Sequence, residues 1–202
     1  MISKIKKFSF VVLLTTVSAF TANAQNATNW KLDKAHSSVN FSINHFFSEV
    51  TGNFTDFNGT FNFDPNNLKG SQFTFTISVS SVNTDNSKRD KHIQSKDFFD
   101  AKSYSKIKFV STKFEKKSDK EFFAHGKLTI RNKTKDVILP FKITGEIEHP
   151  MMKGTIVLGL SLNITLNRSD YNVGTGNWAA TMVVGDEVRI SIPMELNRNI
   201  VI

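Results

Sequence analysis

Apolar and polar residues alternate along most of the chain. The first clear case lies at residues 38–45, where Val39, Phe41, Ile43 and His45 occupy every second position between polar residues. A period of two is typical of β-strands with one buried face and one face in water. The same alternation returns at residues 73–79, 137–143, 156–166 and 188–196. The pattern therefore predicts a mostly β protein with one shared apolar interior.

Weaker alternating runs bring the expected number of strands to about eight. They lie near residues 54–63, 107–114 and 122–130, and turn-forming residues separate the runs at 64–67, 117–120, 131–133 and 174–177. An antiparallel sheet of this size forms either an open sandwich or a closed barrel, and closure has the advantage of removing exposed edges. Pro193, inside the last run, is a mild contrary signal because proline cannot donate to a ladder. It leaves the position of the barrel seam open.

Residues 86–104 break the alternation and predict a short helix and loop, which we interpret as a flap over one end of the sheet. Arg89 and Asp90 could form a charged pair that fixes the flap, while an inward Arg89 could instead bind a phosphate or carboxylate headgroup. Phe98 and Phe99 are adjacent, so their side chains point in different directions. We expect one to cap the interior and the other to anchor the flap.

The first 24 residues have the features of a secretory signal peptide. Three lysines precede an apolar run at residues 8–20, and Ala22-Asn23-Ala24 follows as a small-residue cleavage site. Cleavage after Ala24 leaves 202 − 24 = 178 residues, which predicts a single domain at 25–202. No cysteine follows to accept a lipid or form a disulfide, and no later apolar run is long enough to span a bilayer. We expect a periplasmic or secreted protein without an integral membrane anchor.

Charge changes this picture little. The formal charge of +8 includes three signal-peptide lysines, which leaves 8 − 3 = +5 on the exported chain. Basic residues gather at Lys102, Lys106, Lys108, Lys113, Lys116, Lys117, Lys120, Arg131, Lys133 and Lys135. They form either a solvated strand face or a surface for anionic headgroups or an anionic polymer. The phenylalanines occupy apolar positions rather than exposed stacking platforms, so no nucleic-acid partner is expected.

The polar residues offer little catalytic chemistry. None of the five histidines is paired with another at a metal-binding spacing, and no Gly-x-Ser-x-Gly elbow is present. We expect no catalytic residue, no metal and no cofactor, although an uncharacterised hydrolase stays open as an alternative. His36, beside Ser37 and near Asp33, suits a turn or strand start, and His45 is either structural or meets the polar end of a ligand. Arg168 and Asp170 are expected to hold the loop before Trp178.

Phenylalanine dominates the aromatic residues. The chain has 19 Phe but only 2 Tyr and 2 Trp, and Phe supplies aromatic area without a polar group that needs a partner. Such residues suit the dry wall of a cavity, and they equally suit a solid core filled by side chains.

Several short strings, in order along the chain, resemble those of the YceI-like family. They are Trp30-Lys31-Leu32-Asp33, His36-Ser37-Ser38-Val39-Asn40-Phe41, Val50-Thr51-Gly52-Asn53-Phe54, Phe57-Asn58-Gly59, Arg89-Asp90-Lys91-His92, Asp97-Phe98-Phe99-Asp100, Phe109-Val110-Ser111, His125-Gly126-Lys127-Leu128-Thr129-Ile130, Asn167-Arg168-Ser169-Asp170-Tyr171-Asn172-Val173-Gly174 and Gly185-Asp186-Glu187-Val188. Each string is weak alone, but their shared order is specific. One departure is the turn at Arg131, where the family commonly has a small residue such as Gly.

The resemblance implies a closed, lipocalin-like antiparallel barrel that binds a long-chain isoprenoid or another amphiphilic lipid along its axis, without catalysis. Members of the family are mostly periplasmic or secreted and often dimeric, so a homodimer is a further expectation. Together with the alternation and the flap, the resemblance predicts these ligand-binding residues: Phe41, Ile43, His45, Phe75, Ile77, Arg89, Phe98, Phe99, Phe109, Leu128, Phe141 and Leu160. It leaves the headgroup open, whether a quinone, a prenyl phosphate or a fatty amide.

Overall fold

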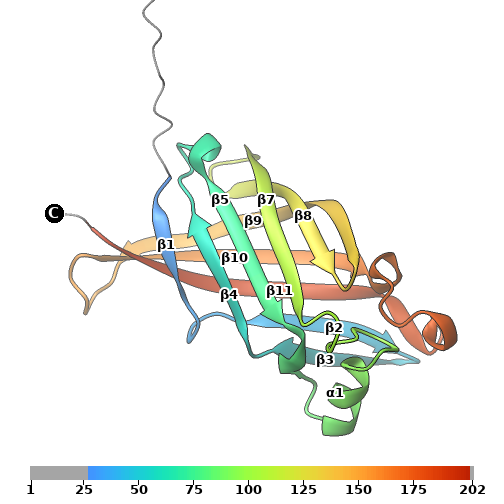
Figure 1. Ribbon diagram of the computed structural model, residues 1–202. Coiled ribbons are helices and arrows are strands. Elements are labelled where there is room, and N and C mark those ends of the chain that lie inside the picture. The colour runs from blue at the N-terminus through green and yellow to red at the C-terminus, as the bar shows by residue number, and fades with distance from the viewer. Residues whose placement is uncertain (1–26, 201–202) are drawn as a thin grey trace, which may run out of the picture.

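The computed structural model describes residues 27–200, so the expected signal peptide at residues 1–24 lies outside the described part. One sheet contains eleven strands. They are β1 (Asn29–Asp33), β2 (Val39–His45), β3 (Ser48–Phe54), β4 (Phe57–Asn62), β5 (Gln72–Ser78), β6 (Val82–Asn83), β7 (Lys106–Lys116), β8 (Glu121–Ile130), β9 (Lys133–Glu148), β10 (Thr155–Asn167) and β11 (Val184–Asn199). A short helix, α1 (Ser87–Ile93), and four 3₁₀ turns, Leu68–Gly70, Val79–Ser81, Arg168–Tyr171 and Gly176–Trp178, complete the described elements (Figure 1).

Six of the strands join end to end into three longer, bent strands. β1 continues into β2, β3 into β4, and β5 into β6, with breaks at residues 34–38, 55–56 and 79–81. Both halves of each bent strand pair with the same neighbour, since β1 pairs with β4 and β2 with β3, and likewise β4 pairs with β5 and β3 with β6. Counted this way the sheet has eight antiparallel strands, and β11 returns to pair with both β1 and β2. The fold is therefore the expected closed barrel with one helix.

Pro193 lies at the break between β1 and β2. β11 pairs with β1 at residues 195–197 and with β2 at residues 184–191, so residue 193 faces the gap between the two. Its carbonyl still accepts a hydrogen bond from Ser38 N at 3.1 Å. At this position β11 forms no ladder pair with β1 or β2, so the lack of an N–H in proline does not remove a ladder hydrogen bond at the seam.

One end of the barrel is filled by a phenylalanine plug, made of Phe63, Phe73, Phe114, Phe122 and Phe141. Phe63 is 1% exposed, and its ring centroid lies 5.3–5.9 Å from those of the other four. Phe122 stacks on Phe141 at 5.5 Å. Offset and edge-to-face contacts of this kind are favourable for aromatic rings. This closed end carries the turns at residues 63–71, 117–120 and 149–154.

The opposite end, the mouth, has an interrupted ladder. The pairing of β9 with β10 stops at Phe141–Leu162, so the last residues of β10 pair only with β11. The mouth loop, residues 168–183, fills this gap, and the flap, residues 86–104, runs from the end of β6 to the start of β7. Figure 1 shows α1 and the mouth loop gathered at one end, away from the carboxyl terminus.

The turn between β8 and β9 explains the departure from the family pattern. Arg131 has a φ of +51°, a conformation that glycine adopts without strain and other residues adopt at a cost of about 1–2 kcal/mol. Its guanidinium donates to the carbonyl of Asn172 and lies over the Tyr104 ring at 5.9 Å. These contacts join the turn to the mouth loop and offset the strain.

Candidate functional site

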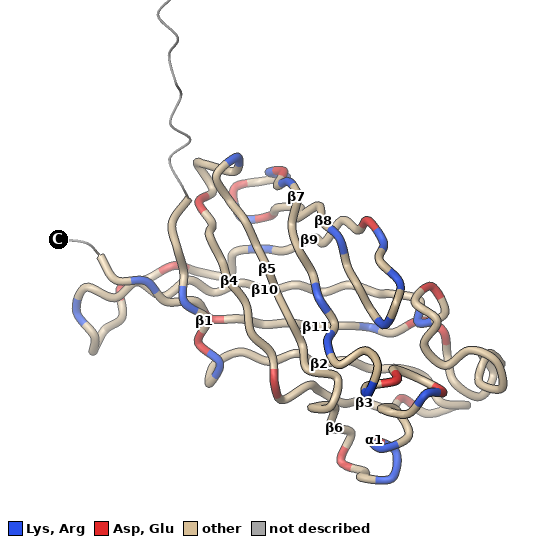
Figure 2. The backbone as a smooth tube through the Cα atoms, in the orientation of Figure 1, with Lys and Arg blue, Asp and Glu red and all other residues tan. Residues whose placement is uncertain are grey.

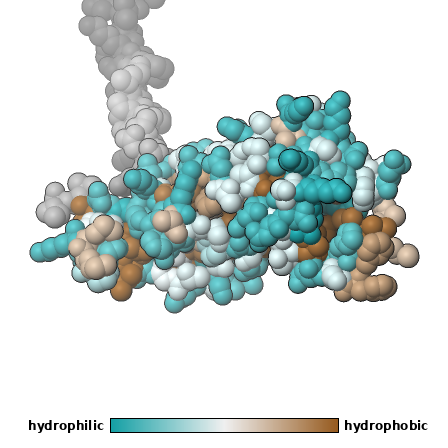
Figure 3. Space-filling model, turned by 90° about the horizontal axis from the view of Figure 1, so that it is seen from below, coloured by the Kyte–Doolittle hydropathy of each residue, from teal (hydrophilic) through white to brown (hydrophobic). Residues whose placement is uncertain are grey.

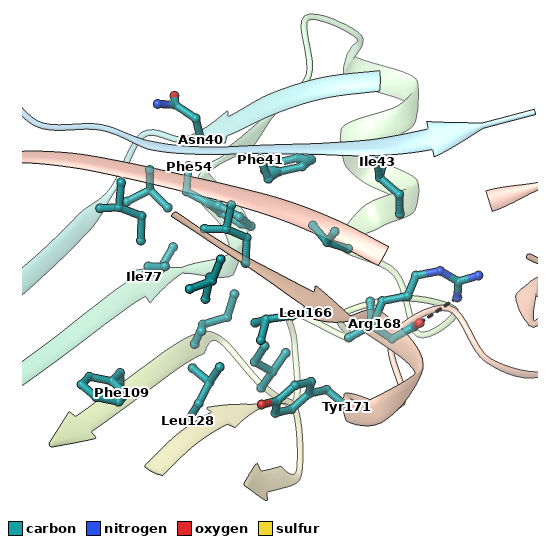
Figure 4. Close-up of a pocket in the computed structure, with 18 of the residues that line it drawn as sticks. Asn40, Phe41, Ile43, Phe54, Ile77, Phe109, Leu128, Leu166, Arg168 and Tyr171 are labelled. Carbon is teal, nitrogen blue, oxygen red and sulfur yellow. Dashed lines mark hydrogen bonds between the residues drawn. The ribbon is translucent and has the colours of Figure 1, made fainter. Parts of the chain in front are cut away.

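The barrel encloses an apolar cavity of about 380 Å³. Its wall comes from the alternating positions of the strands, as Figure 4 shows for Phe41, Ile77 and Leu128. The cavity extends from the phenylalanine plug, where Phe73 and Phe141 contribute to its wall, to the mouth at Val184 and Trp178. Because nearly all the lining groups are apolar, the interior favours an apolar occupant over water.

Every residue that the sequence predicted as ligand-binding lies on the wall of this cavity. Eight come from strand faces, namely Phe41, Ile43, Phe75, Ile77, Phe109, Leu128, Phe141 and Leu160. The other four, His45, Arg89, Phe98 and Phe99, lie at the mouth or on the flap. The phase of the alternation was therefore read correctly, since a one-residue error would have turned these side chains outward. Their contact with a ligand stays a prediction.

Arg168 is the most buried charged group of the site, with 6% of the residue exposed. Its guanidinium has five N–H donors, and they reach five backbone carbonyls, those of Val173, Gly174, Trp178, Val184 and Gly185. Gly174 has a φ of +64°, and a Cβ there would lie 2.6 Å from Nη1 of Arg168. Burial lowers the pKa of Arg168, and burial also raises the pKa of the neighbouring Tyr171.

These bonds give Arg168 a structural role, as expected from the sequence. It holds the mouth loop against the start of β11, and its donors are all occupied by backbone, so it has none left for an anionic headgroup. Asp170 also holds this loop, as expected, because its carboxylate pairs with Lys135 on β9. The pair bridges the gap between β9 and β10.

Arg89 and Asp90 do not form the direct ion pair that the sequence suggested within the described part of the chain. Both side chains instead bind Thr84. The Asp90 carboxylate accepts from the Thr84 hydroxyl at 2.6 Å and from Thr84 N at 3.0 Å, while Arg89 donates to the hydroxyl at 2.7 Å and to the Thr84 carbonyl at 2.6 Å. Thr84, 4% exposed, is therefore the anchor of the flap helix. No periodic signal marked it, because it lies outside the helix and makes its contacts with two helix residues rather than through a repeating pattern.

The two flap phenylalanines contact different parts of the mouth. Phe98 lies 5.6 Å from the Trp178 ring and 5.0 Å from the His92 ring, and His92 also contacts Trp178 at 4.8 Å. Phe99 packs edge-on against Phe54 of β3 at 6.2 Å. Both line the cavity, so each serves as wall and anchor together. The flap and the mouth loop thus contact each other at the mouth through these rings.

His45 and His36 occupy different surroundings. His45 is an exposed residue at the rim of the cavity, where its ring contacts Phe46 at 4.8 Å. His36 lies outside the cavity, with Nδ1 3.0 Å from the Asp33 carboxylate and 3.8 Å from Glu195. The Ser37 hydroxyl accepts a hydrogen bond from Glu195 N rather than from the imidazole. These contacts fit the turn role expected for His36.

The carboxylates and imidazole around His36 also resemble a set of metal ligands that the histidine spacing did not predict. Ligand atoms of Asp33, His36 and Glu195 lie within 4.8 Å of one another. Asp33 is hydrogen-bonded to the His36 ring and to Ala35 N, and the Glu195 carboxylate lies 3.8 Å from that ring. The group is on the outer surface and none of its members lines the cavity.

Four of the ten residues in the basic stretch form ion pairs. Lys113 pairs with Glu115, Lys116 with Asp119, Lys117 with Glu121 and Lys135 with Asp170. Exposed pairs of this kind contribute little stability. Figure 2 shows the basic and acidic residues interspersed over these strands, which favours the solvated-face interpretation over a binding surface for an anionic polymer.

Fold and cavity together define the class of protein: a closed antiparallel barrel with an apolar lumen that is plugged at one end and open at the other. The sequence matches the YceI-like domain family over residues 30–196, and the chain belongs to this family. It is 36% identical to Protein YceI of Escherichia coli O157:H7 over 159 residues, which cover 77% of this chain and 82% of that protein.

Solved structures show the same fold. The crystal structure of Burkholderia cenocepacia BcnA matches with a TM-score of 0.71 and 29% identity, covering 84% of this chain and 100% of that one. A polyisoprenoid binding domain from Saccharophagus degradans matches with a TM-score of 0.61 and 14% identity over 83% of this chain and 97% of that one. Among the described residues, no helix is both long and apolar enough to cross a bilayer.

Proposed function

We propose that this protein is an exported carrier or store that encloses the chain of a long isoprenoid or other lipid in its lumen. The observation that carries the proposal is the lumen itself, which is apolar along its length, plugged by phenylalanine at one end and bordered by Arg89, His92 and Asn167 at the other. A lipid chain fits the interior, and a polar headgroup fits the mouth. The name of the Saccharophagus relative is consistent with such a ligand.

The size of the cavity supports a bound ligand. Its volume of about 380 Å³ lies within the usual range for ligand pockets. Each isoprene unit that fills the lumen contributes about 3–4 kcal/mol, so a few units offset an association cost of about 4–15 kcal/mol.

The structure favours binding over catalysis at this site. The cations nearest the lumen, Arg89 and Arg168, are engaged by Thr84 and by backbone carbonyls, which suits fixed walls rather than reacting groups. The length and shape of the lipid chain would then select the ligand more strongly than hydrogen bonds or ion pairs to the protein.

Native mass spectrometry before and after organic extraction tests the proposal. We expect the protein purified without detergent to carry an apolar ligand that extraction releases. Ile77→Asp should lose more than about nine-tenths of that ligand, because an unpaired carboxylate in an apolar lumen is costly. Ile138→Asp is the matched control, since Ile138 is 57% exposed whereas Ile77 is 8% exposed.

Both variants must keep the wild-type far-UV circular dichroism spectrum for the comparison to count. A correctly folded Ile77→Asp protein that retained the same lipid in the same amount would contradict the proposal. So would a wild-type protein that never carried an apolar ligand and bound none when it was added. Either result would point to a barrel whose function lies on its outer surface.

A further inference from the structure

We propose that the mouth of the barrel docks on a lipid bilayer through an apolar tip formed by Phe46, Phe47 and Met182. These residues are 56%, 105% and 84% exposed. Phe46 and Phe47 are the two turn residues of the β2–β3 hairpin, and Met182 belongs to the mouth loop. Phe46 N donates to the carbonyl of Val183 at 3.0 Å, which places the two segments together.

The hairpin turn is unusual for its position. Turns of two residues between strands favour Gly, Asn or Asp, because one or both residues need a positive φ. Here Phe46 has a φ of +50°, a conformation that is a rare outlier for a bulky side chain. Two exposed phenylalanines in a strained turn lower the solubility of the protein and do not stabilise its fold. A binding role therefore explains this turn better than a structural role does.

The rest of the tip is also uncharged. The chain has no charged side chain between Asp170 and Asp186, although Ala179, Ala180 and Met182 in this stretch are exposed. Figure 3 shows hydrophobic surface gathered at the two ends of the elongated molecule. Loops with exposed aromatic and apolar residues and no charge can enter the boundary between headgroups and acyl chains.

The position of the tip and the charge behind it favour a bilayer as the occupant. His45 and Val184, beside the tip, line the mouth of the cavity, so a docked tip would set the lumen opening against the membrane. Lys88, Lys91, Lys102, Lys106 and Lys133 lie at the same end of the barrel, and none forms an ion pair within the described chain. Lysines near a membrane attract anionic headgroups. The choice of lipid as the occupant rests on the proposed function.

Vesicle flotation measures docking, using phosphatidylcholine vesicles with and without phosphatidylglycerol. We expect binding to both, stronger with phosphatidylglycerol and weaker at high salt. Phe47→Ser should weaken binding about tenfold, and Met182→Ser by a smaller factor. Met151→Ser is the matched control, because Met151 is 86% exposed at the closed end, and it should leave binding unchanged.

Quenching by brominated acyl chains gives a second measurement. Trp178 lies at the mouth, whereas Trp30 is 5% exposed at the closed end, so quenching reports insertion of the mouth.

The proposal is overturned if wild type binds neither vesicle, if Met151→Ser weakens binding as much as the tip variants, or if Phe47→Ser only converts a dimer to monomers. Lipid retention without vesicles is measured in parallel. If the protein carries no lipid but still binds vesicles, and the tip variants weaken that binding, the result supports docking and contradicts only the proposal that the lumen holds a lipid.

Discussion

The two ends of this barrel are built by different means. At the closed end five phenylalanines pack against one another inside the barrel, and the ladder between β9 and β10 extends to Glu148 and Ile156. At the mouth the ladder between β9 and β10 is missing after Leu162, and hydrogen bonds to loops, ion pairs and ring contacts take its place. The closed end therefore depends on burial and backbone pairing, and the mouth depends on a few side chains.

This difference separates stability from access. Packed aromatic cores open only when the whole domain unfolds, whereas loops fixed by a few contacts open locally at lower free energy. A binding protein needs a rigid base for the chain and a mouth that admits it. The same difference gives three predictions with effects of decreasing size.

Replacing Phe63 by alanine should have the largest effect on stability. Phe63 is 1% exposed and touches four other rings, so the cavity left behind should cost about 3–5 kcal/mol of unfolding free energy. Chemical denaturation measures this loss. Phe47→Ala at the mouth is the control, and because that side chain is exposed it should change stability by less than about 0.5 kcal/mol. Equal losses of unfolding free energy for the two variants would show that the plug does not contribute more stability than the mouth.

Replacing Arg168 by methionine should act locally and less strongly. The variant keeps an apolar stem but leaves five backbone carbonyls without their donor, so the mouth loop should open at a cost of about 1–3 kcal/mol. Hydrogen exchange should speed up at residues 171–185 while strands β7 and β8 stay protected. Arg168→Lys, with three donors, should give an intermediate result. Uniform loss of protection would mean that Arg168 supports the whole barrel.

The smallest effect concerns the turn that joins the two halves of the first bent strand. The hydrogen bond between Asp33 and His36 lowers the pKa of Asp33 and raises the pKa of His36. The Asp33 contribution is lost as pH falls through its folded pKa, and the His36 contribution is lost as pH rises through its folded pKa. The pair should therefore stabilise the turn most at weakly acidic pH, by a small amount because both groups are accessible to solvent.

An NMR titration of the His36 ring tests this, with Asp33→Asn as the comparison. The variant should bring the His36 pKa back toward its ordinary value. A titration unchanged by the substitution would show that Glu195, rather than Asp33, holds the imidazole.

The strand faces could be predicted because their pattern is local. Phe41, Ile77 and Leu160 repeat every second position with their neighbours, and this period alone places them on the inner face of the sheet, which in the structure lines the cavity. The helix in the flap was likewise predictable, since Asn86 caps its first turn by accepting from Arg89 N at 3.0 Å.

The contacts of the mouth could not be predicted, because they join residues distant in the sequence or depend on backbone geometry. The contact between Arg131 and Asn172, for example, joins residues 41 positions apart. Thr84 lies close in sequence to Arg89 and Asp90, but nothing in the sequence distinguishes it from an ordinary turn threonine. The plug was not foreseen either, since alternation shows that Phe63 and Phe122 face inward but not that they meet. The positive φ of Phe46 could not be predicted from the sequence, because turns that need this conformation usually have glycine at that position.

The breaks in the three bent strands lie next to one another in the ring, at residues 34–38, 55–56 and 79–81. Together they form a crease across one side of the wall, with β1, β4 and β5 above it and β2, β3 and β6 below it (Figure 1). The lower panel can change its angle without shifting the register of the upper panel, because no ladder crosses the crease except through β11. Insertions at the crease are therefore expected to change the width of the opening while the depth of the barrel stays the same.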